Sequence, residues 1–447
     1  MIAETLVQFG NENRKYSFPI CTNMETGEIL RLLNGWWTTG IVSENLARKF
    51  KRKSFKDALS ILTNYRQILV LTGLRRVGKS TIMYQLINDL ISSVSPLKII
   101  YFSFDFGSEE LQLILREYQK ITKIDWKTEE TFLFLDEIQK QKNWAPQLKM
   151  IYDAFPNVKF VVSGSASLQL EREVMENLAG RYYLIDVPVL SLVEYFSLEH
   201  DEGIENARLN EDRIKLEIEP YIRKPFPELV KVADERMIYE YIRESVISKI
   251  LGQDLISEFE KVEIPLLNSL INLFFSEPGM TLNYDGLART LSKRKETIER
   301  HVYMLEFSKL IRVIKNYRPS TMSESRKLKK VYPYDISLAL SYFPSLERGR
   351  VTEALLMSRL NTKRYWREGS KEVDALYETR GGQIPIEIKA SNTLKPEHMK
   401  NLKFYVSKFG GNLGILLYNG RDVKIGKIMA IDIEDVLIYG FEKTINE

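Results

Sequence analysis

Eight consecutive residues of this chain have the types and spacing that hold a phosphate group. The run is Gly73-Leu74-Arg75-Arg76-Val77-Gly78-Lys79-Ser80, and it matches G-x-x-x-x-G-K-[ST] at every fixed position. Glycines let the backbone fold around phosphate oxygens, and the N-terminus of a following helix adds partial positive charge. Lys79 would add a full charge, Ser80 a ligand for Mg²⁺, and Thr81 a further phosphate contact. The motif predicts a site for ATP and Mg²⁺.

The residues on either side of this motif have the pattern that such a loop requires. Residues 68–71 form a short apolar run typical of a buried strand, and residues 82–90 have apolar residues at helical spacing. The glycines therefore fall at a strand-to-helix turn, where a phosphate-binding loop is expected.

A pair of carboxylates follows another apolar run. Residues 131–135 are strand-like and end in Asp136 and Glu137. In phosphoryl transfer such residues have separate roles: Asp136 would hold Mg²⁺ through water, and Glu137 would orient or deprotonate the attacking water. Two acids after a strand can also form a solvated turn, but the phosphate-binding motif upstream favours catalysis.

Hydroxyl groups follow a third strand-like run, residues 160–162. Ser163-Gly164-Ser165 comes directly after it, and Ser163 is a candidate contact for the γ-phosphate. The alternative is that Ser163 and Ser165 cap the next helix. The residue types leave both interpretations open.

The composition is that of a globular protein with several domains. The chain has 447 residues, of which 44% are hydrophobic and 28% charged, and this length predicts about three domains. Cys21 is the only cysteine, so a reducing compartment without disulfides is expected. No apolar stretch approaches the roughly 20 residues of a membrane span, and the N-terminus lacks the pattern of a signal peptide. We therefore expect a cytoplasmic protein with no membrane partner.

The patterns along the chain predict an α/β fold built around a P-loop NTPase core. Strand-like runs alternate with helical stretches, which is typical of a parallel sheet with crossover helices. These runs are residues 68–71, 98–104, 132–135, 159–162 and 182–187. Helical patterns follow, for example at residues 235–251, and fit a lid on that core. The predicted parts are an N-terminal segment (1–45), the ATPase core (46–198), a helical lid (199–275), a winged helix (276–345) and a second α/β domain (346–447).

Basic residues are concentrated in one segment. The net charge is only +4, but residues 285–331 contain 13 Lys or Arg against 5 Asp or Glu, a local balance of +8. Two helices (287–291 and 295–306) and two strands (310–317 and 328–333) predict a winged helix, whose second helix would enter the major groove of DNA. The candidate DNA contacts are Lys293, Arg294, Lys295, Arg300, Arg326 and Lys327. The alternative is a domain for packing or oligomerisation.

Near the C-terminus, two acids and a lysine are spaced for a metal-dependent attack on a phosphodiester. Residues 373–389 have the pattern of a hairpin in which Glu387 and Lys389 share one face and Asp374 can lie beside them. Glu353, on a helical stretch upstream, would complete an acidic cluster for a divalent cation. The order helix, hairpin, helix, strand predicts a restriction-endonuclease-like core. Such a hairpin can also be a solvated surface feature, and such a domain can bind DNA without cutting it.

Taken together, these motifs resemble the archaeal branch of the AAA-type P-loop ATPases, in which an AAA+ core is followed by a winged helix and a C-terminal nuclease-like domain of PD-(D/E)xK type. The resemblance is carried by Gly73 to Ser80, Asp136-Glu137, Ser163-Gly164-Ser165, Leu178-Ala179-Gly180-Arg181, Leu190-Ser191 with Glu194-Tyr195-Phe196, and Asp374 with Glu387-Ile388-Lys389. It implies ATP hydrolysis, dependence on Mg²⁺, an archaeal source and homo-oligomers, including rings, in which an arginine completes a neighbour's site. Arg181 is the candidate for that arginine, for a γ-phosphate sensor in its own subunit, or for a structural salt bridge.

Three functions are consistent with these features. The favoured one is a DNA-dependent ATPase that remodels or processes branched or recombining DNA held by the winged helix. The second is a regulatory switch in which ATP controls assembly with a protein partner. The third is a metal-dependent nuclease gated by ATP, which would act through Asp374, Glu387 and Lys389.

Overall fold

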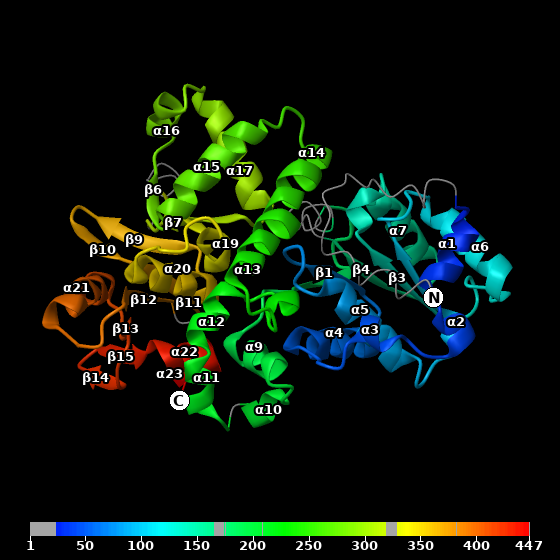
Figure 1. Ribbon diagram of the computed structural model, residues 1–447, viewed down its shortest axis with the longest axis horizontal. Helices are drawn as coiled ribbons and strands as arrows, with labels where there is room; N and C mark the ends of the chain where they lie inside the picture. The colour runs from blue at the N-terminus through cyan, green and yellow to red at the C-terminus, as the bar shows by residue number, and fades with distance from the viewer. Residues whose placement is uncertain are drawn as a thin grey trace.

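Three five-stranded sheets make up the computed structural model of the chain. It describes residues 24–164, 174, 176–207, 209–318, 329–380 and 382–446. The predictions for Cys21, Ser165, Arg326 and Lys327 lie outside these ranges. In Figure 1 the first sheet lies apart from the other two, and the helices of residues 192–258 lie between them. Within the described ranges, none of the helices is long and apolar enough to cross a membrane.

The first sheet is fully parallel and has the strand order β2-β3-β4-β1-β5. Its strands are β1 (Ile68–Thr72), β2 (Ile99–Ser103), β3 (Thr131–Asp136), β4 (Val158–Ser163) and β5 (Tyr182–Asp186). All five predicted strands are confirmed to within one residue at each end. The sequence pattern was informative for β1, β2 and β3 because strands buried on both faces are continuous apolar runs. The edge strand β5 is only partly buried.

Helices cover both faces of this sheet. They are α1 (Thr26–Leu33), α2 (Trp36–Thr39), α3 (Glu44–Ala47), α4 (Lys53–Asn64), α5 (Lys79–Leu90), η2 (Pro96–Lys98), α6 (Leu111–Thr122), η3 (Ile138–Lys140) and α7 (Trp144–Ala154). The helices α4 and α5 pack on one face, and α6 and α7 pack on the other. Side chains of β1 alternate between these two cores, as the two-residue period of a strand requires.

A helical region follows the first sheet. Its elements are α9 (Leu192–Glu199), α10 (Ile204–Ala207), α11 (Glu211–Leu216), α12 (Ile218–Arg223), η4 (Pro227–Leu229), α13 (Glu235–Tyr241), η5 (Ile242–Ile247), η6 (Ile250–Asp254) and α14 (Leu255–Glu258). The elements from α13 to α14 form one continuous helix, which Figure 1 shows in green, with π-helical turns at η5 and η6. The helix predicted at residues 235–251 is therefore confirmed and extends further. We call residues 235–258 the long helix.

Helices and an antiparallel hairpin form the next unit, in the order that the winged-helix prediction expects. The elements are α15 (Ile264–Ser276), β6 (Met280–Leu282), α16 (Tyr284–Thr290), α17 (Lys295–Phe307), β7 (Ile311–Asn316), β8 (Lys329–Pro333) and α19 (Ile336–Leu340). The helix α15, which the prediction placed in the lid, packs against α17 and β8. The strand β7 also pairs with β9 (Arg364–Glu368) in parallel, and β9 pairs with β10 (Lys371–Val373). The second sheet, β10-β9-β7-β8-β6, therefore crosses the predicted domain boundary at residue 346.

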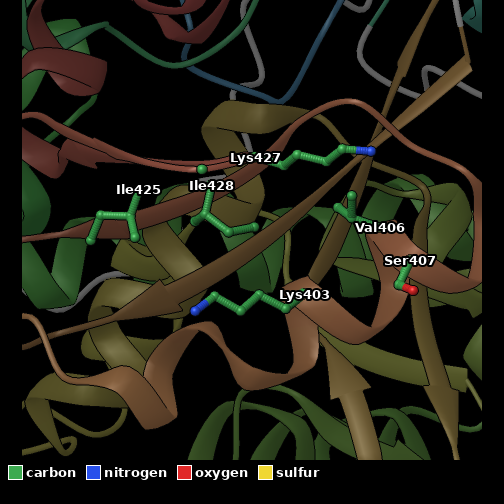
Figure 2. Close-up of a pocket in the computed structure, with 7 residues that line it drawn as sticks. Lys403, Val406, Ser407, Ile425, Lys427 and Ile428 are labelled. Carbon is green, nitrogen blue, oxygen red and sulfur yellow. The ribbon is translucent and has the colours of Figure 1, made fainter.

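The third sheet, β11-β12-β13-β15-β14, contains the C-terminal hairpin. Its strands are β11 (Ala375–Thr379), β12 (Gly382–Lys389), β13 (Gly414–Tyr418), β14 (Val423–Ile425) and β15 (Ile428–Asp432). The helices of this part of the chain are α20 (Arg348–Leu360), η7 (Pro396–Met399), α21 (Lys400–Phe409), α22 (Ile433–Tyr439) and α23 (Phe441–Asn446). The predicted helix, hairpin, helix and strand occur in that order, with β9 and β10 of the second sheet between α20 and the hairpin. A groove of about 450 Å³ lies between α21 and the β14–β15 hairpin, and Figure 2 shows residues that line it. The groove lies at the amino end of β13, where Gly414 pairs with Ile428. Lys389 pairs with Tyr418 at the other end of β13, so the groove is separate from the predicted site of Lys389.

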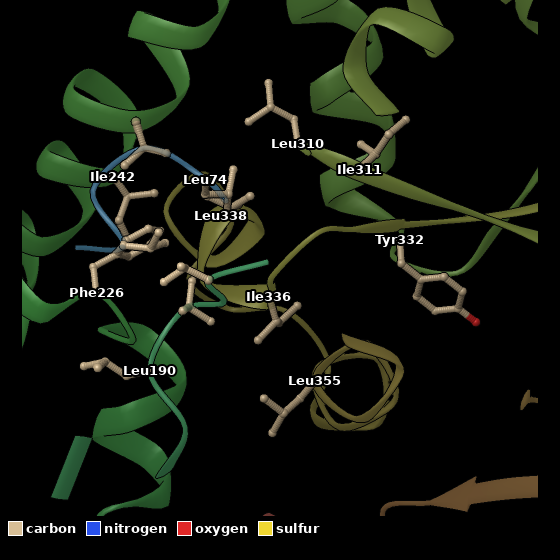
Figure 3. Close-up of a cluster of buried hydrophobic side chains, with 14 of the residues drawn as sticks. Leu74, Leu190, Phe226, Ile242, Leu310, Ile311, Tyr332, Ile336, Leu338 and Leu355 are labelled. Atoms are coloured by element: carbon tan, nitrogen blue, oxygen red, sulfur yellow. The ribbon is translucent and has the colours of Figure 1, made fainter. Parts of the chain in front are cut away.

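One apolar core joins the first sheet to the two that follow it. It includes Leu74, at the tip of the phosphate-binding loop, which is 1% exposed. Figure 3 shows Leu74 among Phe226, Ile242 and Leu338, which come from the helical region and from α19. The loop is therefore packed against the C-terminal half of the chain.

Candidate nucleotide and carboxylate sites

The two glycines of the phosphate-binding loop are required by its shape. Gly73 has φ +145° and Gly78 has φ +96°, which are conformations that L side chains rarely adopt. A side chain at Gly73 would also collide with the carbonyl oxygen of Val187, which follows β5. The loop is therefore held tightly against the neighbouring strand, and α5 begins directly after it at Lys79.

Lys79 is buried at the start of α5, with 5% of its surface exposed. Its Nζ donates to the carbonyl oxygens of Gly73 at 3.1 Å and Leu74 at 2.9 Å. Burial lowers the pKa of Lys79 from its ordinary value, although the charges of Glu137 and Asp136 oppose this effect. The ammonium group thus lies inside the loop, where phosphate oxygens would be better partners than carbonyl groups.

Asp136, at the end of β3, accepts hydrogen bonds from three hydroxyl groups. Ser80 Oγ donates to Oδ2 at 2.6 Å, Tyr101 Oη donates to Oδ2 at 2.8 Å, and Ser163 Oγ donates to Oδ1. Burial raises the pKa of Asp136, and the charge of Glu137 adds to this shift. Ser163 is therefore placed at Asp136, and its contact with a γ-phosphate stays a prediction. Tyr101 was missed by sequence reasoning, although a hydroxyl-bearing residue in the apolar run of β2 was a signal.

Glu137 occupies the turn after β3 in a left-handed conformation, with φ +52°. A non-glycine residue with positive φ is uncommon and often marks a functional turn. Gln139 Nε2 donates to Glu137 Oε2 at 2.6 Å, and this bond orients the carboxylate. Glu137 thus lies beside Asp136, as a residue that positions water would.

The residues around the loop fit a nucleotide with Mg²⁺. Ser80 and Asp136 already share a hydrogen bond, and their oxygens are the hard ligands that Mg²⁺ prefers. The glycine-shaped loop and Lys79 suit phosphate. When bound, Mg²⁺ would neutralise charge on the phosphate oxygens.

Arg181 lies at the opposite edge of the first sheet from the phosphate-binding loop. Its carbonyl oxygen accepts from the N–H of Ile68, the first residue of β1, whereas the loop follows the last residue of β1. The guanidinium forms two hydrogen bonds with Asp153, at 2.8 and 3.1 Å. The salt bridge is therefore present, and this position does not favour a role as γ-phosphate sensor in its own subunit. The role at a neighbour's site stays a prediction.

The candidate DNA contacts near α17 lie on the surface, and three of them have partners. Lys293 Nζ lies 2.5 Å from Glu263 Oε2, and Lys295 Nζ lies 3.1 Å from Asp285 Oδ2. Arg300 donates to the carbonyl oxygen of residue 261 at 3.3 Å. Arg294 is exposed at the N-cap of α17. Such exposed ion pairs are weak, so phosphate groups can replace the acidic partners.

Two lysines of the basic segment are buried and have a different role. Lys309 Nζ lies 2.6 Å from Asp186 Oδ1 at the end of β5, and Lys330 Nζ lies 2.6 Å from Glu372 Oε1. Both side chains are less than a tenth exposed. The local balance of +8 therefore overstates the charge that faces solvent, which composition alone did not reveal.

The hairpin β11–β12 brings the predicted acids and lysine together. Lys389 Nζ lies 2.8 Å from Glu387 Oε1 and 3.9 Å from Asp374 Oδ2. Asp374 also accepts from the N–H of Ile388 at 2.9 Å. Glu387 is 5% exposed, and its Oε2 has no hydrogen-bond partner. Burial and the charge of Asp374 raise the pKa of Glu387 to about 8, and the charge of Lys389 opposes this shift only in part.

Glu353 is held by a different set of partners. Tyr332 Oη donates to Glu353 Oε1 at 2.5 Å, and Lys330 Nζ lies 3.6 Å from the same oxygen. In the part of the chain that the structure describes, no three His, Cys, Asp or Glu side chains are grouped to hold a metal ion. The predicted cluster of Glu353, Asp374 and Glu387 is therefore corrected to a pair, Asp374 and Glu387. Sequence reasoning missed Tyr332 and Lys330 because β8 is distant in the chain.

Comparison with known families agrees with the geometry of the first sheet. Residues 65–196 match the family described as an AAA domain. Residues 219–346 match a domain of unknown function, DUF8612, and residues 349–436 match a second one, DUF4143. The parallel sheet, the loop after β1 and the acids after β3 are thus parts of an AAA-type P-loop domain.

Several proteins without assigned functions are similar to this chain. Two come from Methanocaldococcus jannaschii: one is 25% identical over 71% of this chain and 74% of the relative, and the other is 26% identical over 72% and 73%. A protein of Haemophilus influenzae is 26% identical over 56% of this chain and 62% of the relative. Relatives thus occur in an archaeon and in a bacterium, and the archaeal source stays a prediction.

Two solved structures have a weak likeness to this chain. AMPPCP-bound DnaA from Aquifex aeolicus is 17% identical, with 60% of this chain and 89% of that chain covered and a TM-score of 0.26. PCH-2 from C. elegans is 15% identical, with 61% and 68% covered and a TM-score of 0.24. At these scores the likeness carries no argument about function, and the AAA assignment rests on the family match and the sheet order.

Proposed function

We propose that this protein is an ATPase that requires Mg²⁺ and uses ATP hydrolysis to remodel or process DNA. The observation that carries the proposal is the meeting of Lys79, Ser80 and Asp136 at the carboxyl edge of a parallel sheet of AAA type. Branched or recombining DNA is the proposed substrate. The direct test is phosphate release from ATP with Mg²⁺, measured with and without duplex, single-stranded and junction DNA. Turnover that no DNA form stimulates would contradict the DNA-dependent part.

DNA binding is proposed for the turn between α16 and α17, where Lys293 and Arg294 are exposed. Their replacement by alanine should weaken binding to every DNA sequence and reduce the salt slope of log K by about 2, because each phosphate contact contributes about 0.9. Fluorescence anisotropy between about 50 and 200 mM salt measures this slope.

The matched control for this experiment is Lys120→Ala, which removes an exposed lysine that is ion-paired with Glu117 on α6. It should leave the slope unchanged. An equal effect of both variants would show that binding follows net charge and not the proposed surface.

The C-terminal hairpin is proposed to be a metal-dependent nuclease site, in which Asp374 and Glu387 hold a divalent cation and Lys389 positions water. We expect Mn²⁺-dependent cleavage of junction or duplex DNA, and we expect Lys389→Ala to lower its rate by about 100-fold or more. Glu378→Gln, an exposed acid on the same hairpin, is the control. Cleavage that persists in Lys389→Ala would place the activity elsewhere, and intact DNA with both Mg²⁺ and Mn²⁺ would remove the proposal.

A regulatory switch is the second candidate, and one observation favours it. The phosphate-binding loop packs against the helical region through Leu74, so a change in the loop would be transmitted to the C-terminal half. ATP would then control assembly with a protein partner or into a homo-oligomer. In that oligomer Arg181, whose side chain is 32% exposed, would exchange Asp153 for a neighbour's site. Slow turnover that DNA leaves unchanged, with a nucleotide-dependent change in mass by light scattering, would favour the switch.

A further inference from the structure

An arginine of the phosphate-binding loop is held by an acid of the long helix. Arg75 Nε donates to Asp254 Oδ2 at 2.6 Å, and Nη2 donates to Oδ1 of the same carboxylate. The side chains are 20% and 10% exposed. Asp254 is the last residue of the π-helical turn η6. The pair is therefore a bidentate, largely buried contact between the loop and the helical region, which is the stronger class of charged hydrogen bond.

The position of Arg75 places it among the candidate catalytic groups. It follows Leu74, whose carbonyl oxygen accepts from Lys79 Nζ at 2.9 Å. Asp254 raises the pKa of Arg75, and the charges of Glu137 and Asp105 act in the same direction. The charge of Arg75 in turn lowers the pKa of Lys79, though less than burial does. Arg75 thus shares one electrostatic environment with the phosphate-binding lysine and the acid proposed to activate water.

The neighbouring arginine shows that this placement is not general to the loop. Arg76 Nη1 lies 3.4 Å from Glu228 Oε1, and both side chains are about half exposed. Of the two arginines in the loop, Arg75 is therefore the more buried and the one held by a bidentate contact.

We propose that Arg75 is a catalytic arginine supplied by the chain's own phosphate-binding loop, and that Asp254 is a positioning residue that holds it until nucleotide binds. This inference rests on the proposed ATP hydrolysis. In that step the water oxygen forms a bond to the γ-phosphorus, the bond from the γ-phosphorus to the β–γ bridging oxygen breaks, and the electron pair leaves with ADP. The water proton passes to Glu137. The Arg75 guanidinium stabilises the negative charge on the γ-phosphate oxygens during this transfer.

The exchange of partners by Arg75 also couples hydrolysis to the long helix. When the guanidinium moves from Asp254 to phosphate, Asp254 is left without its main partner, and the buried carboxylate favours a shift of the helix toward solvent or another donor. The π-helical turns at η5 and η6 are the kind of irregularity that lets a helix change register at a functional site. The same pair thereby links ATP to the elements that carry the proposed DNA surface.

Separate measurements of binding, turnover and transition-state mimicry test this role. We expect Arg75→Ala to lower kcat by on the order of 1,000-fold, the lower end for an arginine that acts on phosphoryl transfer. ADP affinity, measured with a fluorescent ADP analogue, should stay nearly unchanged. Aluminium fluoride bound beside ADP mimics the transferred phosphoryl group and should raise the ADP affinity of the wild type. In Arg75→Ala this gain in affinity should disappear. Arg75→Lys should recover part of kcat, since it keeps the charge but not the bidentate geometry.

Two further variants separate catalysis from structure. Asp254→Asn should keep or raise kcat, because it releases Arg75. If the pair were purely structural, kcat would fall in both Arg75→Ala and Asp254→Asn. Arg223→Ala breaks an arginine–carboxylate pair with Glu219 elsewhere in the helical region and should leave kcat and the fluoride effect unchanged. The unfolding midpoint of each nucleotide-free variant reports on the structural contribution.

The outcomes distinguish this inference from the proposed function. A wild type that hydrolyses ATP, with Arg75→Ala equal to it in kcat, overturns the inference alone. A fall in ADP affinity as large as the fall in kcat also overturns it, because the arginine would then serve ground-state binding. A wild type without hydrolysis and without a fluoride effect overturns both.

Discussion

Replacing Lys79 with methionine should reduce ATP hydrolysis by on the order of 100- to 1,000-fold, the effect of removing one preorganised charge from a site of this kind. The ammonium group is the one full charge at the start of α5, and its present partners are the carbonyl oxygens of Gly73 and Leu74. Methionine fills a similar volume but donates no hydrogen bond. Phosphate release and the binding of a fluorescent ATP analogue measure the loss.

The stability of Lys79→Met should not fall together with its activity. Lys79 is buried, and burial lowers its pKa, so the folded state carries an unfavourable desolvation term for this charge. Lys79→Met removes that term and should leave the unfolding midpoint unchanged or raised. A variant that is inactive only because it unfolds would contradict this expectation.

Lys98→Met is the matched control, because Lys98 lies in the same domain in a partly exposed ion pair with Glu129. Its rate of hydrolysis should equal that of the wild type. If Lys79→Met also hydrolyses ATP at the wild-type rate, the loop after β1 is not the nucleotide site.

The first sheet was predictable from sequence because its signals are local. Its strands are mainly apolar runs, interrupted in β4 by Lys159, and the loop, Asp136 and Glu137 follow two of these runs directly. Local patterns also located α17 and the hairpin β11–β12. In each case a period of 2 or 3.6 residues determines both the element and the direction of its side chains.

The contacts that join these elements were not predictable for the same reason. The strands β7 and β9 pair in parallel although they are distant in the chain, and no residue type in either strand encodes the partner. Lys309 and Lys330 look like surface charge in a basic segment, but each lies against an acid from a distant part of the chain. The pairing of Arg75 with Asp254 joins residues 179 positions apart. Such pairs depend on tertiary packing, to which composition and periodicity are insensitive.

Replacing Arg52 with alanine should lower the free energy of unfolding by about 3–5 kcal/mol, the cost of leaving a buried charge without its partner. Arg52 is 5% exposed, and its Nη2 donates to Glu194 Oε2 at 2.8 Å. Its guanidinium also donates to the carbonyl oxygens of Val77, Pro188 and Val189 at 2.8–3.0 Å. The side chain thus connects the phosphate-binding loop to the segment after β5. Chemical denaturation at neutral pH measures the change.

The pH dependence of this loss has a defined sign. Burial raises the pKa of Glu194, but the charge of Arg52 and hydrogen bonds from Arg52 and two backbone N–H groups outweigh it, so the net shift is downward. A depressed folded pKa contributes stability that is present above the unfolded value, about 4.3, and is lost as pH falls through the folded pKa. The difference between wild type and Arg52→Ala should therefore narrow below about pH 4. Arg213→Ala, which breaks an exposed pair with Glu202, should cost less than about 1 kcal/mol at any pH. Equal losses in the two variants would show that the buried pair contributes no more than a surface one.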